Sequence, residues 1–198
     1  MVSGPSLIGL TGGLAAGKSE ALKILGELGA ATLSTDAVVH DLLGTEEVRD
    51  RLTERWGREV AQDGVVDRGR VGAIVFERPE ELTWLESLLH PLVGEQVLAW
   101  RRGVPQDVEV AVVEVPLLFE GTMEAMFDAT IAISAEHGER RRRADERGTG
   151  ALEARSGRQL SQEEKAARAT FAIDNDGTPA ELHAALEGLF PALRAAGA

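Results

Sequence analysis

Cysteine is absent from the 198 residues of this chain, so neither disulfide bonds nor thiolate metal sites are possible. Its absence excludes one route to extracellular stability and fits a reducing compartment. Long apolar runs are also missing. No segment approaches the roughly 18 uninterrupted apolar residues of a membrane span, and the first residues lack the basic stretch and apolar core of a secretion signal. The sequence therefore predicts a cytoplasmic protein with no membrane partner.

Lysine is scarce, and positive charge is in deficit overall. Three Lys stand against 18 Arg, and the formal net charge is −12. This excess of negative charge argues against a nucleic-acid partner, because a phosphate backbone needs a basic face. The charge is unevenly spread: residues 138–168 carry nine Arg or Lys and six Asp or Glu, a local balance of +3, which leaves −15 for the remainder. A codon bias toward Arg would explain the preference for Arg but not this clustering.

The feature around which the chain is organised is a glycine-rich motif near the N-terminus. It fits the pattern G-x-x-x-x-G-K-[ST] and reads Gly12-Gly13-Leu14-Ala15-Ala16-Gly17-Lys18-Ser19. The apolar run at residues 7–10 indicates a buried strand, and apolar residues at helical spacing follow the motif as far as Gly29. Strand, turn and helix are the context in which this motif forms a phosphate-binding P-loop.

Each part of the motif has a role in phosphate chemistry. The glycines allow a tight turn whose main-chain N–H groups point at phosphate oxygens, and the N-terminus of the following helix adds partial positive charge. Lys18 reaches the terminal phosphates, and Ser19 supplies a hydroxyl ligand for magnesium. The sequence therefore predicts a site for a nucleoside triphosphate with Mg²⁺.

Apolar runs of β type alternate along the chain with helical patterns. The five predicted strands are residues 7–10, 31–34, 108–115, 130–134 and 171–173. Such alternation is typical of a parallel sheet covered by helices on both faces, and ligands bind such sheets at the carboxyl ends of the strands. We therefore expect an α/β fold, a P-loop NTPase three-layer sandwich with a five-stranded parallel sheet.

Two intervals between the predicted strands are too long to be simple crossovers. We interpret residues 37–104 as a helical insertion that binds and covers the second substrate, and residues 136–168, rich in arginine, as a lid. The core then comprises about residues 1–36, 105–135 and 170–198. Because no linker suggests an independent second domain, residues 1–198 are expected to form a single domain.

A P-loop alone does not distinguish a kinase from a GTPase or an ATPase motor, so the remaining polar residues matter. Asp36 stands at the end of the second predicted strand, where a carboxylate faces the phosphate site. It can accept a proton from an attacking hydroxyl or help to hold magnesium. The alternative, which is not exclusive, is that Asp36 caps the helix that follows.

Glu114 lies in the apolar run Ala111-Val112-Val113-Glu114-Val115, where an acid is costly unless it is paired or near a cation. In P-loop proteins the strand beside the P-loop strand supplies a carboxylate on the magnesium side. Glu114 is the candidate for that role. The alternative is a position at a sheet edge or a strand-end turn that faces solvent.

An arginine cluster, Arg140-Arg141-Arg142-Arg143 with Arg147, Arg155 and Arg158, begins the predicted lid. Guanidinium groups stabilise the negative charge that phosphoryl transfer spreads over the transferred group. Four consecutive arginines on a helix cannot all face one way, so at most two point at a ligand and the others form a solvated face. His90, before Pro91 in an apolar helix, is either a buried core residue or a ligand of the second substrate.

Specific short runs follow one another along the chain: Ile8-Gly9-Leu10-Thr11-Gly12-Gly13 leading into the P-loop, Asp36, Trp84-Leu85 with Leu88-Leu89-His90-Pro91-Leu92, Pro116-Leu117-Leu118-Phe119-Glu120, Arg155 with Gln159, Glu163-Glu164-Lys165, and Ile173-Asp174-Asn175-Asp176-Gly177. In these runs, taken in this order, the chain resembles the dephospho-CoA kinase family over nearly its full length. That family transfers the γ-phosphoryl group of ATP to the ribose 3′-hydroxyl of dephospho-CoA. The run around His90 and the Pro-Leu-Leu-Phe-Glu run are not expected in a general P-loop kinase.

The resemblance implies a role for each matching residue. The residues implied to be catalytic are Asp36, Lys18, Arg143 and Arg147. The nucleotide phosphates lie on Gly12, Gly13, Leu14, Ala15, Ala16, Gly17, Lys18 and Ser19, with Asn175 near the adenine. The acceptor contacts are Asp36, His90, Leu117, Glu120 and Arg155. Ser19 and Glu114 are implied on the magnesium side.

The sequence departs from the family pattern at a few positions. Ala15 and Ala16 stand where the family usually has Gly-Ser, and Glu20 replaces a usual Thr beside the phosphates. Thr170 and Phe171 replace a pair that usually contains Asp. Because the sequence Gly-Lys-Ser that ends the P-loop is intact, we expect nucleotide binding to be kept, with Glu20 weakening it modestly.

The resulting expectation is a single kinase domain, an ATP-dependent phosphotransferase that acts on dephospho-CoA with Mg²⁺ in the last step of coenzyme A biosynthesis. Its partners are small molecules, and we expect a monomer or weak homo-oligomer. The alternative is a P-loop kinase for another small acceptor, such as a nucleoside monophosphate. A nucleotide-binding regulatory switch without transfer activity is the alternative from another class.

Overall fold

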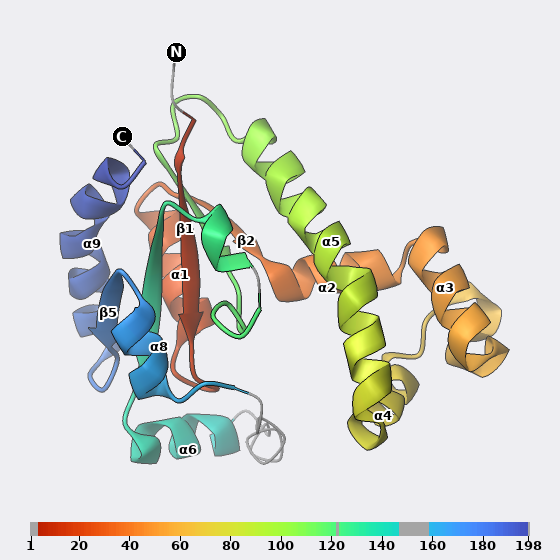
Figure 1. Ribbon diagram of the computed structural model, residues 1–198. Coiled ribbons are helices and arrows are strands. Elements are labelled where there is room, and N and C mark those ends of the chain that lie inside the picture. The colour runs from red at the N-terminus through yellow and green to blue at the C-terminus, as the bar shows by residue number, and fades with distance from the viewer. Residues whose placement is uncertain (1–3, 122, 147–158, 198) are drawn as a thin grey trace. The chain divides into compact units, whose positions relative to one another are not determined.

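The computed structural model describes residues 4–121, 123–146 and 159–197 (Figure 1). The chain forms two compact units, one made of Met1–Ser34 with Trp100–Ala198 and the other of Thr35–Ala99. Within the described ranges, every helix is too short or too polar to pass through a lipid bilayer.

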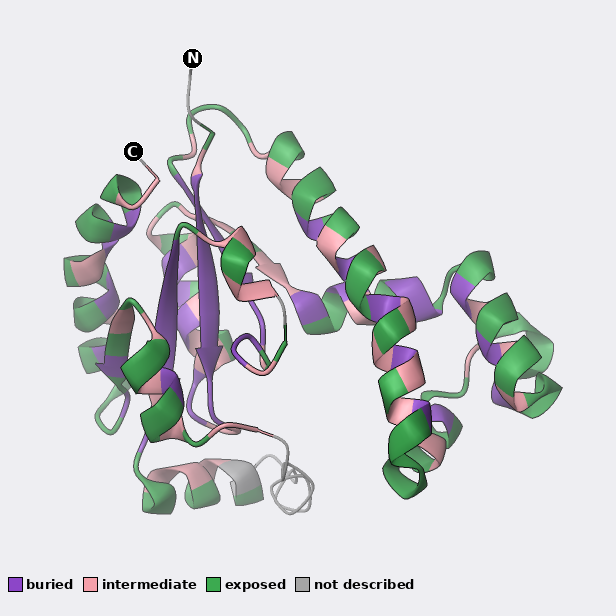
Figure 2. Cartoon of the chain, viewed as in Figure 1, coloured by how far each residue is buried: buried purple, intermediate pink, exposed green. Residues whose placement is uncertain are grey.

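A five-stranded parallel sheet forms the centre of the first unit. Its strands are β1 (Ser6–Gly12), β2 (Ala31–Ser34), β3 (Val110–Glu114), β4 (Ala129–Ser134) and β5 (Phe171–Asp174), in the order β2-β3-β1-β4-β5. All four pairings are parallel. The parallel five-stranded sheet predicted from the sequence is confirmed, and the P-loop strand β1 occupies its middle, where Figure 2 shows it fully buried.

Helices cover both faces of this sheet, as the alternating pattern predicts. On one face, α1 (Lys18–Glu27) and α9 (Pro179–Ala195) form the main apolar core with the strands, through side chains such as Ile24, Leu25, Leu186 and Phe190. On the other face lie α8 (Gln162–Arg168) and the segment after β3, which includes the 3₁₀ turn η3 (Met123–Met126) (Figure 1). The helix α6 (His137–Glu146) follows β4.

The third strand is shorter than the apolar pattern predicts. Residues 108–115 read as one run, but β3 covers only Val110–Glu114. The main-chain N–H of Val108 donates to the carbonyl of Pro105 in a turn, 3.1 Å away, and so cannot join the sheet ladder. A local turn therefore replaces the first predicted residues of the strand.

The second unit is built from helices. It contains α2 (Thr35–Leu43), α3 (Glu46–Trp56), the 3₁₀ turns η1 (Arg58–Val60) and η2 (Gln62–Gly64), α4 (Arg68–Glu77) and most of α5 (Pro79–Gly103). Its polar centre is Glu81, which is only 8% exposed. Glu81 accepts hydrogen bonds from Arg55 Nε at 3.0 Å and Trp56 Nε1 at 2.8 Å, and Trp56 packs edge to face on Trp84 with ring centroids 5.2 Å apart.

Candidate active site

The P-loop follows β1 and ends where α1 begins. Gly17 caps α1 with a φ of +104°, and a Cβ there would also overlap the side-chain amide of Asn175. Ala15 takes a left-handed φ of +57°, a region that a residue with a Cβ adopts at a cost. This backbone geometry explains why a glycine is usual at position 15 in the family that the sequence resembles.

The loop presents donors that the protein itself does not use. In the described part of the structure, the main-chain N–H groups of Leu14, Ala15 and Gly17 donate to no protein acceptor. Unpaired N–H groups at a helix N-terminus form an anion-binding site, to which the helix dipole adds partial positive charge. Lys18 brings a full charge to the same place, since its Nζ donates to the carbonyls of Gly12 and Gly13 at 3.2 and 2.9 Å.

Asn175 supports the loop from the end of β5. Its Nδ2 donates to the Ala16 carbonyl at 2.8 Å, and its main-chain N–H donates to the Ser134 carbonyl at 2.7 Å. The residue is buried, with 6% of its surface exposed. The structure therefore places Asn175 beside the P-loop, which it ties to the neighbouring strand β4. Its contact with the adenine stays a prediction.

Of the predicted lid arginines, Arg143 lies at this site. Its Nη2 donates to the main-chain oxygen of Asn175 at 3.0 Å, and only 16% of its side chain is exposed. Its Nη1 is buried and has no protein partner in the described part of the chain. This nitrogen lies 4.0 Å from the ideal Cβ position of Gly17, so an unused donor is aimed at the P-loop. The two other arginines to which the resemblance gave a role, Arg147 and Arg155, lie outside the described residues.

Glu114 is the last residue of β3 and lies between two strands. It stands opposite Leu10 of β1 and Ser34 of β2, with 6% of its surface exposed. The alternative of a solvent-facing edge or turn is therefore wrong. A buried carboxylate at the carboxyl end of the strand beside the P-loop strand meets the geometric requirement for the magnesium-side acid.

The residues present fit a magnesium ion held mainly by its nucleotide. Ser19 is exposed in the first turn of α1, so its hydroxyl is accessible. Within the described ranges, no three His, Asp or Glu side chains form a cluster that could hold a metal by themselves. A Mg²⁺ ion that keeps its waters and phosphate ligands needs only one or two protein groups, and Ser19 with the Glu114 carboxylate supplies that number.

The predicted acceptor residues Asp36 and His90 belong to the second unit. Asp36 is exposed in the first turn of α2, two residues after β2 ends, and its carboxylate has no hydrogen-bond or ionic partner among the described residues. Because α2 starts at Thr35, Asp36 lies inside the helix and is not the capping residue. His90 is exposed on α5, so the buried-core alternative is wrong. The role of both as acceptor contacts stays a prediction.

The run Pro116-Leu117-Leu118-Phe119-Glu120 forms the loop after β3. Leu117 is 38% exposed and can contact a ligand, whereas Leu118 is fully buried. Glu120 is engaged within the protein: its Oε1 lies 3.0 Å from Nζ of Lys165 and accepts the N–H of Leu160 at 2.8 Å. The predicted contact of Glu120 with the acceptor therefore competes with an internal ion pair.

Sequence reasoning missed a small cavity beside the P-loop. It has a volume of about 240 Å³ and is lined by Gly13, Leu14, Arg140 and the residues around the start of α8, among them Gln162. Glu163 also borders it, and hydrogen bonds from its own main-chain N–H and from Ser161 lower the pKa of this carboxyl, with Arg140 contributing further. The sequence signal for this helix start was the capping box of Ser161 and Glu164.

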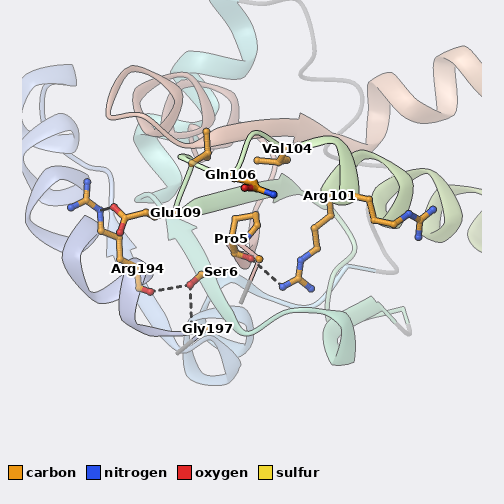
Figure 3. Close-up of a pocket in the computed structure, with 11 residues that line it drawn as sticks. Pro5, Ser6, Arg101, Val104, Gln106, Glu109, Arg194 and Gly197 are labelled. Carbon is orange, nitrogen blue, oxygen red and sulfur yellow. Dashed lines mark hydrogen bonds and ion pairs between the residues drawn. The ribbon is translucent and has the colours of Figure 1, made fainter. Parts of the chain in front are cut away.

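A separate cavity of about 510 Å³ lies at the opposite end of β1, where Ser6 begins the strand (Figure 3). Most of the polar groups that line it form hydrogen bonds or ion pairs with one another. Arg194 forms an ion pair with Glu109 at 3.2 Å, and its carbonyl accepts the Ser6 hydroxyl at 3.0 Å; Arg101 donates to the Pro5 carbonyl at 3.1 Å. We assign it no part in the chemistry at the P-loop.

The chain is similar to known proteins over most of its length. The family model described as CoaE, dephospho-CoA kinase, matches residues 6–181. The chain belongs to the dephospho-CoA kinase family. The dephospho-CoA kinase of Deinococcus radiodurans is 38% identical over 188 residues, which cover 93% of this chain and 88% of that protein. That of Leifsonia xyli subsp. xyli is 36% identical over 195 residues, covering 95% and 98%.

A solved structure agrees with the fold over nearly the whole chain. The crystal structure of TT1252 from Thermus thermophilus superposes with a TM-score of 0.82 at 30% sequence identity, covering 96% of this chain and 98% of that one. The family match confirms the family of ATP-using kinases that the sequence motifs predicted, and the structural match confirms the P-loop α/β fold.

One departure from the family pattern has a structural account. Thr130 and Thr170 exchange two hydrogen bonds: the Thr130 N–H donates to Oγ1 of Thr170 at 3.1 Å, and the Thr170 N–H donates to Oγ1 of Thr130 at 3.0 Å. The pair joins the start of β4 to the residue before β5. Phe171 packs against the apolar core. Thr170 and Phe171 therefore both make contacts on this side of the sheet.

Proposed function

We propose that this chain transfers the γ-phosphoryl group of Mg-ATP to the ribose 3′-hydroxyl of dephospho-CoA, giving coenzyme A. The observation that carries the proposal is a P-loop with three unpaired main-chain donors and a lysine, in a chain that matches the dephospho-CoA kinase family over residues 6–181. Phosphoryl transfer needs little covalent chemistry from the protein, so positioning and charge stabilisation are the steps to account for.

On the donor side, the N–H groups of Leu14, Ala15 and Gly17 and the ammonium of Lys18 hold the phosphates. Lys18 exchanges its two carbonyl contacts, to Gly12 and Gly13, for phosphate oxygens. These charge-assisted hydrogen bonds are stronger than the neutral ones they replace, which favours the exchange. Asn175 keeps the loop in the shape that these contacts require.

On the acceptor side, Asp36 takes the proton of the ribose 3′-hydroxyl as that oxygen attacks the γ-phosphorus in line. His90, Leu117 and Arg155 are the residues proposed to contact dephospho-CoA. The exposed setting of Asp36 leaves its carboxylate free to accept a hydroxyl proton. We propose, with this, that residues 37–104 bind the acceptor and that residues 136–168 close over ATP.

Charge that develops during transfer is neutralised by Lys18 and by the unused Nη1 donor of Arg143, or by Arg147. Magnesium bound to the phosphates supplies further positive charge, with Ser19 and Glu114 on its side of the site. Exchanging Glu114 for Gln keeps the volume and removes the charge. The variant Glu114→Gln should need a higher Mg²⁺ concentration for half-maximal rate, by about tenfold, the scale on which loss of an outer-shell partner weakens a metal site.

The test of the function is a coupled ADP-release assay across dephospho-CoA, AMP, CMP and shikimate. We expect dephospho-CoA alone to stimulate ADP release strongly, with a product phosphorylated at the 3′ position by mass spectrometry. Stimulation by a nucleoside monophosphate instead would support a kinase for another small acceptor. Nucleotide binding without stimulation by any acceptor would support a regulatory switch.

Sedimentation tests the expected monomer or weak homo-oligomer, and cell fractionation tests the expected cytoplasmic location.

A further inference from the structure

Gln162, the first residue of α8, joins the P-loop to the end of β4. Its side-chain amide pairs with both main-chain groups of Ala135: Oε1 accepts the N–H at 3.1 Å, and Nε2 donates to the carbonyl at 2.9 Å. The methylene part of the same side chain fills the space beside Gly13, where a Cβ would lie 2.9 Å from Cγ of Gln162. Gln162 thus leaves room for no side chain at position 13, and α8 packs directly against the P-loop there.

One turn further along α8, Lys165 is completely buried, with 0% of its surface exposed. Its Nζ donates to the Pro116 carbonyl at 2.6 Å and lies 3.0 Å from Oε1 of Glu120, whose side chain is 12% exposed. The same Oε1 accepts the N–H of Leu160, two residues before α8. The pair therefore fixes both α8 and the residues that lead into it.

The Pro116 carbonyl connects this pair to β1 as well. It accepts a second hydrogen bond, from the hydroxyl of Thr11 at 3.3 Å, and Thr11 is buried in the strand that leads into the P-loop. Lys165 thus shares an acceptor with the residue before Gly12. The Pro116 carbonyl and the Lys165 ammonium therefore connect α8, which carries Gln162, to β1, which leads into Gly13.

A buried ion pair is a poor choice if stability alone is needed. Removing two charges from water costs about as much as their attraction returns, and apolar pairs of similar volume often stabilise a fold equally well. Glu120 carries a further cost, since its Oε2 is buried and has no partner in the described part of the chain. What the pair supplies beyond an apolar contact is a fixed direction and distance, because its hydrogen bonds are directional.

We propose that Lys165 and Glu120 are positioning residues for phosphoryl transfer, which hold α8 so that Gln162 keeps Gly13 and the P-loop in the shape that receives the triphosphate. The proposal rests on the proposed function, since it takes the bound triphosphate to be the donor. Glu120 then acts on the donor side through α8, where the sequence resemblance implied a contact with the acceptor.

The test compares Glu120→Gln, Lys165→Met, the double variant and Gln162→Leu. The dissociation constant of Mg-ATP, measured by titration calorimetry without acceptor, should rise about tenfold in each single variant, within the range of typical couplings between sites. The KM for dephospho-CoA should stay within about twofold of the wild-type value. The double variant should bind Mg-ATP no worse than the weaker single variant, because the two residues act as one unit.

The outcome that overturns the proposal is a Glu120→Gln variant with unchanged Mg-ATP affinity and a raised KM for dephospho-CoA, since this is the result of a direct acceptor contact. Unchanged Mg-ATP affinity in Gln162→Leu overturns it equally. Should Lys165→Met fail to fold, Lys165→Arg and Gln162→Leu decide: Lys165→Arg keeps the charge and should recover part of the lost affinity. Failure of the proposed function would appear separately, as wild-type enzyme that binds Mg-ATP but gives no ADP with dephospho-CoA.

A matched control exists on the same two segments. Arg168 of α8 pairs with Glu124 of η3 at 2.6 Å, but this pair is much more exposed than Lys165 and Glu120, with side-chain exposures of 45% and 43%. Glu124→Gln removes this exposed pair and should leave both Mg-ATP affinity and kcat unchanged, since surface pairs contribute little. A loss of Mg-ATP affinity in Glu124→Gln equal to that in Glu120→Gln would show that any loosening of α8 suffices and would refute a specific role for the buried pair.

Discussion

Arg143 and Asn175 are joined by one hydrogen bond, 3.0 Å long, from the guanidinium Nη2 to the main-chain oxygen of Asn175. Through its own side chain Asn175 then holds the carbonyl of Ala16. An arginine of the predicted lid is therefore attached to the P-loop through a single intervening residue. Its second nitrogen, Nη1, is left buried and unpaired within the described residues, at the place where phosphate charge is expected.

Replacing Arg143 by Met should lower kcat about 10²- to 10³-fold, the usual effect of losing one donor to a developing charge. The measurement is steady-state ADP release at saturating Mg-ATP and dephospho-CoA. Arg141 on the same helix is exposed and serves as the control, so Arg141→Met should retain normal turnover. A normal kcat in Arg143→Met would assign the phosphate contact to another arginine, with Arg147 the remaining candidate.

Asp36→Asn should keep Mg-ATP affinity nearly intact and lower kcat by about 10²-fold or more, the usual contribution of a positioned base. The neighbouring Asp41 is exposed at the other end of α2, and Asp41→Asn is the matched control. Calorimetry gives the affinity and the coupled assay gives the turnover. Near-normal turnover in Asp36→Asn would remove this carboxylate from the chemistry.

Glu20 places negative charge in the first turn of α1, beside the phosphate site. Its side chain is 42% exposed and lies 3.9 Å from Lys23, so the charge is only partly compensated. Glu20→Thr should tighten Mg-ATP binding about two- to fivefold, corresponding to roughly 0.3–1 kcal/mol, with a larger effect at low salt. Glu27→Thr at the far end of α1 should have no effect. If Glu20→Thr weakens binding, the repulsion argument is wrong.

Acid should weaken the second unit through Glu81. Hydrogen bonds from Arg55 and then Trp56 hold the pKa of this carboxyl below its ordinary value of 4.5, so its stabilising contribution is present above that value and is lost as the pH falls through the lowered pKa. In Glu81→Gln this part of the acid sensitivity should disappear, although stability at neutral pH should be lower. Thermal unfolding followed by circular dichroism between pH 3 and pH 7 checks the slope. Parallel wild-type and variant curves would contradict the assignment.

The contiguous features of the site could be predicted from the sequence. The P-loop motif, the strand before it and the helix after it are local, so periodicity and glycine spacing sufficed. The sequence also singled out Glu114, because an acid inside an apolar run is costly unless it is paired or near a cation. Its role on the magnesium side stays a prediction. The family resemblance followed from short runs of specific residues and was confirmed by the match over residues 6–181.

The contacts that support the P-loop could not be predicted from the sequence. Asn175 and Ala16 are 159 positions apart, and nothing in either segment indicates that one amide meets one carbonyl. Lys165 belongs to the charged run Glu163-Glu164-Lys165, which reads as a solvated helix face, yet it is fully buried. Which residue of such a run turns inward depends on the packing of α8 against the loop after β3, and that packing is a tertiary property.

The tryptophan pair of the second unit gives the protein an optical property of its own. The chain contains no tyrosine and three tryptophans, so its near-ultraviolet emission comes from Trp56, Trp84 and Trp100. Trp56 and Trp84 lie in contact in the second unit, and Trp100 lies on α5. The P-loop, α1, α8 and α9 contain no tryptophan. Intrinsic emission is therefore a built-in signal from α3 and α5, separate from the segments that hold the triphosphate.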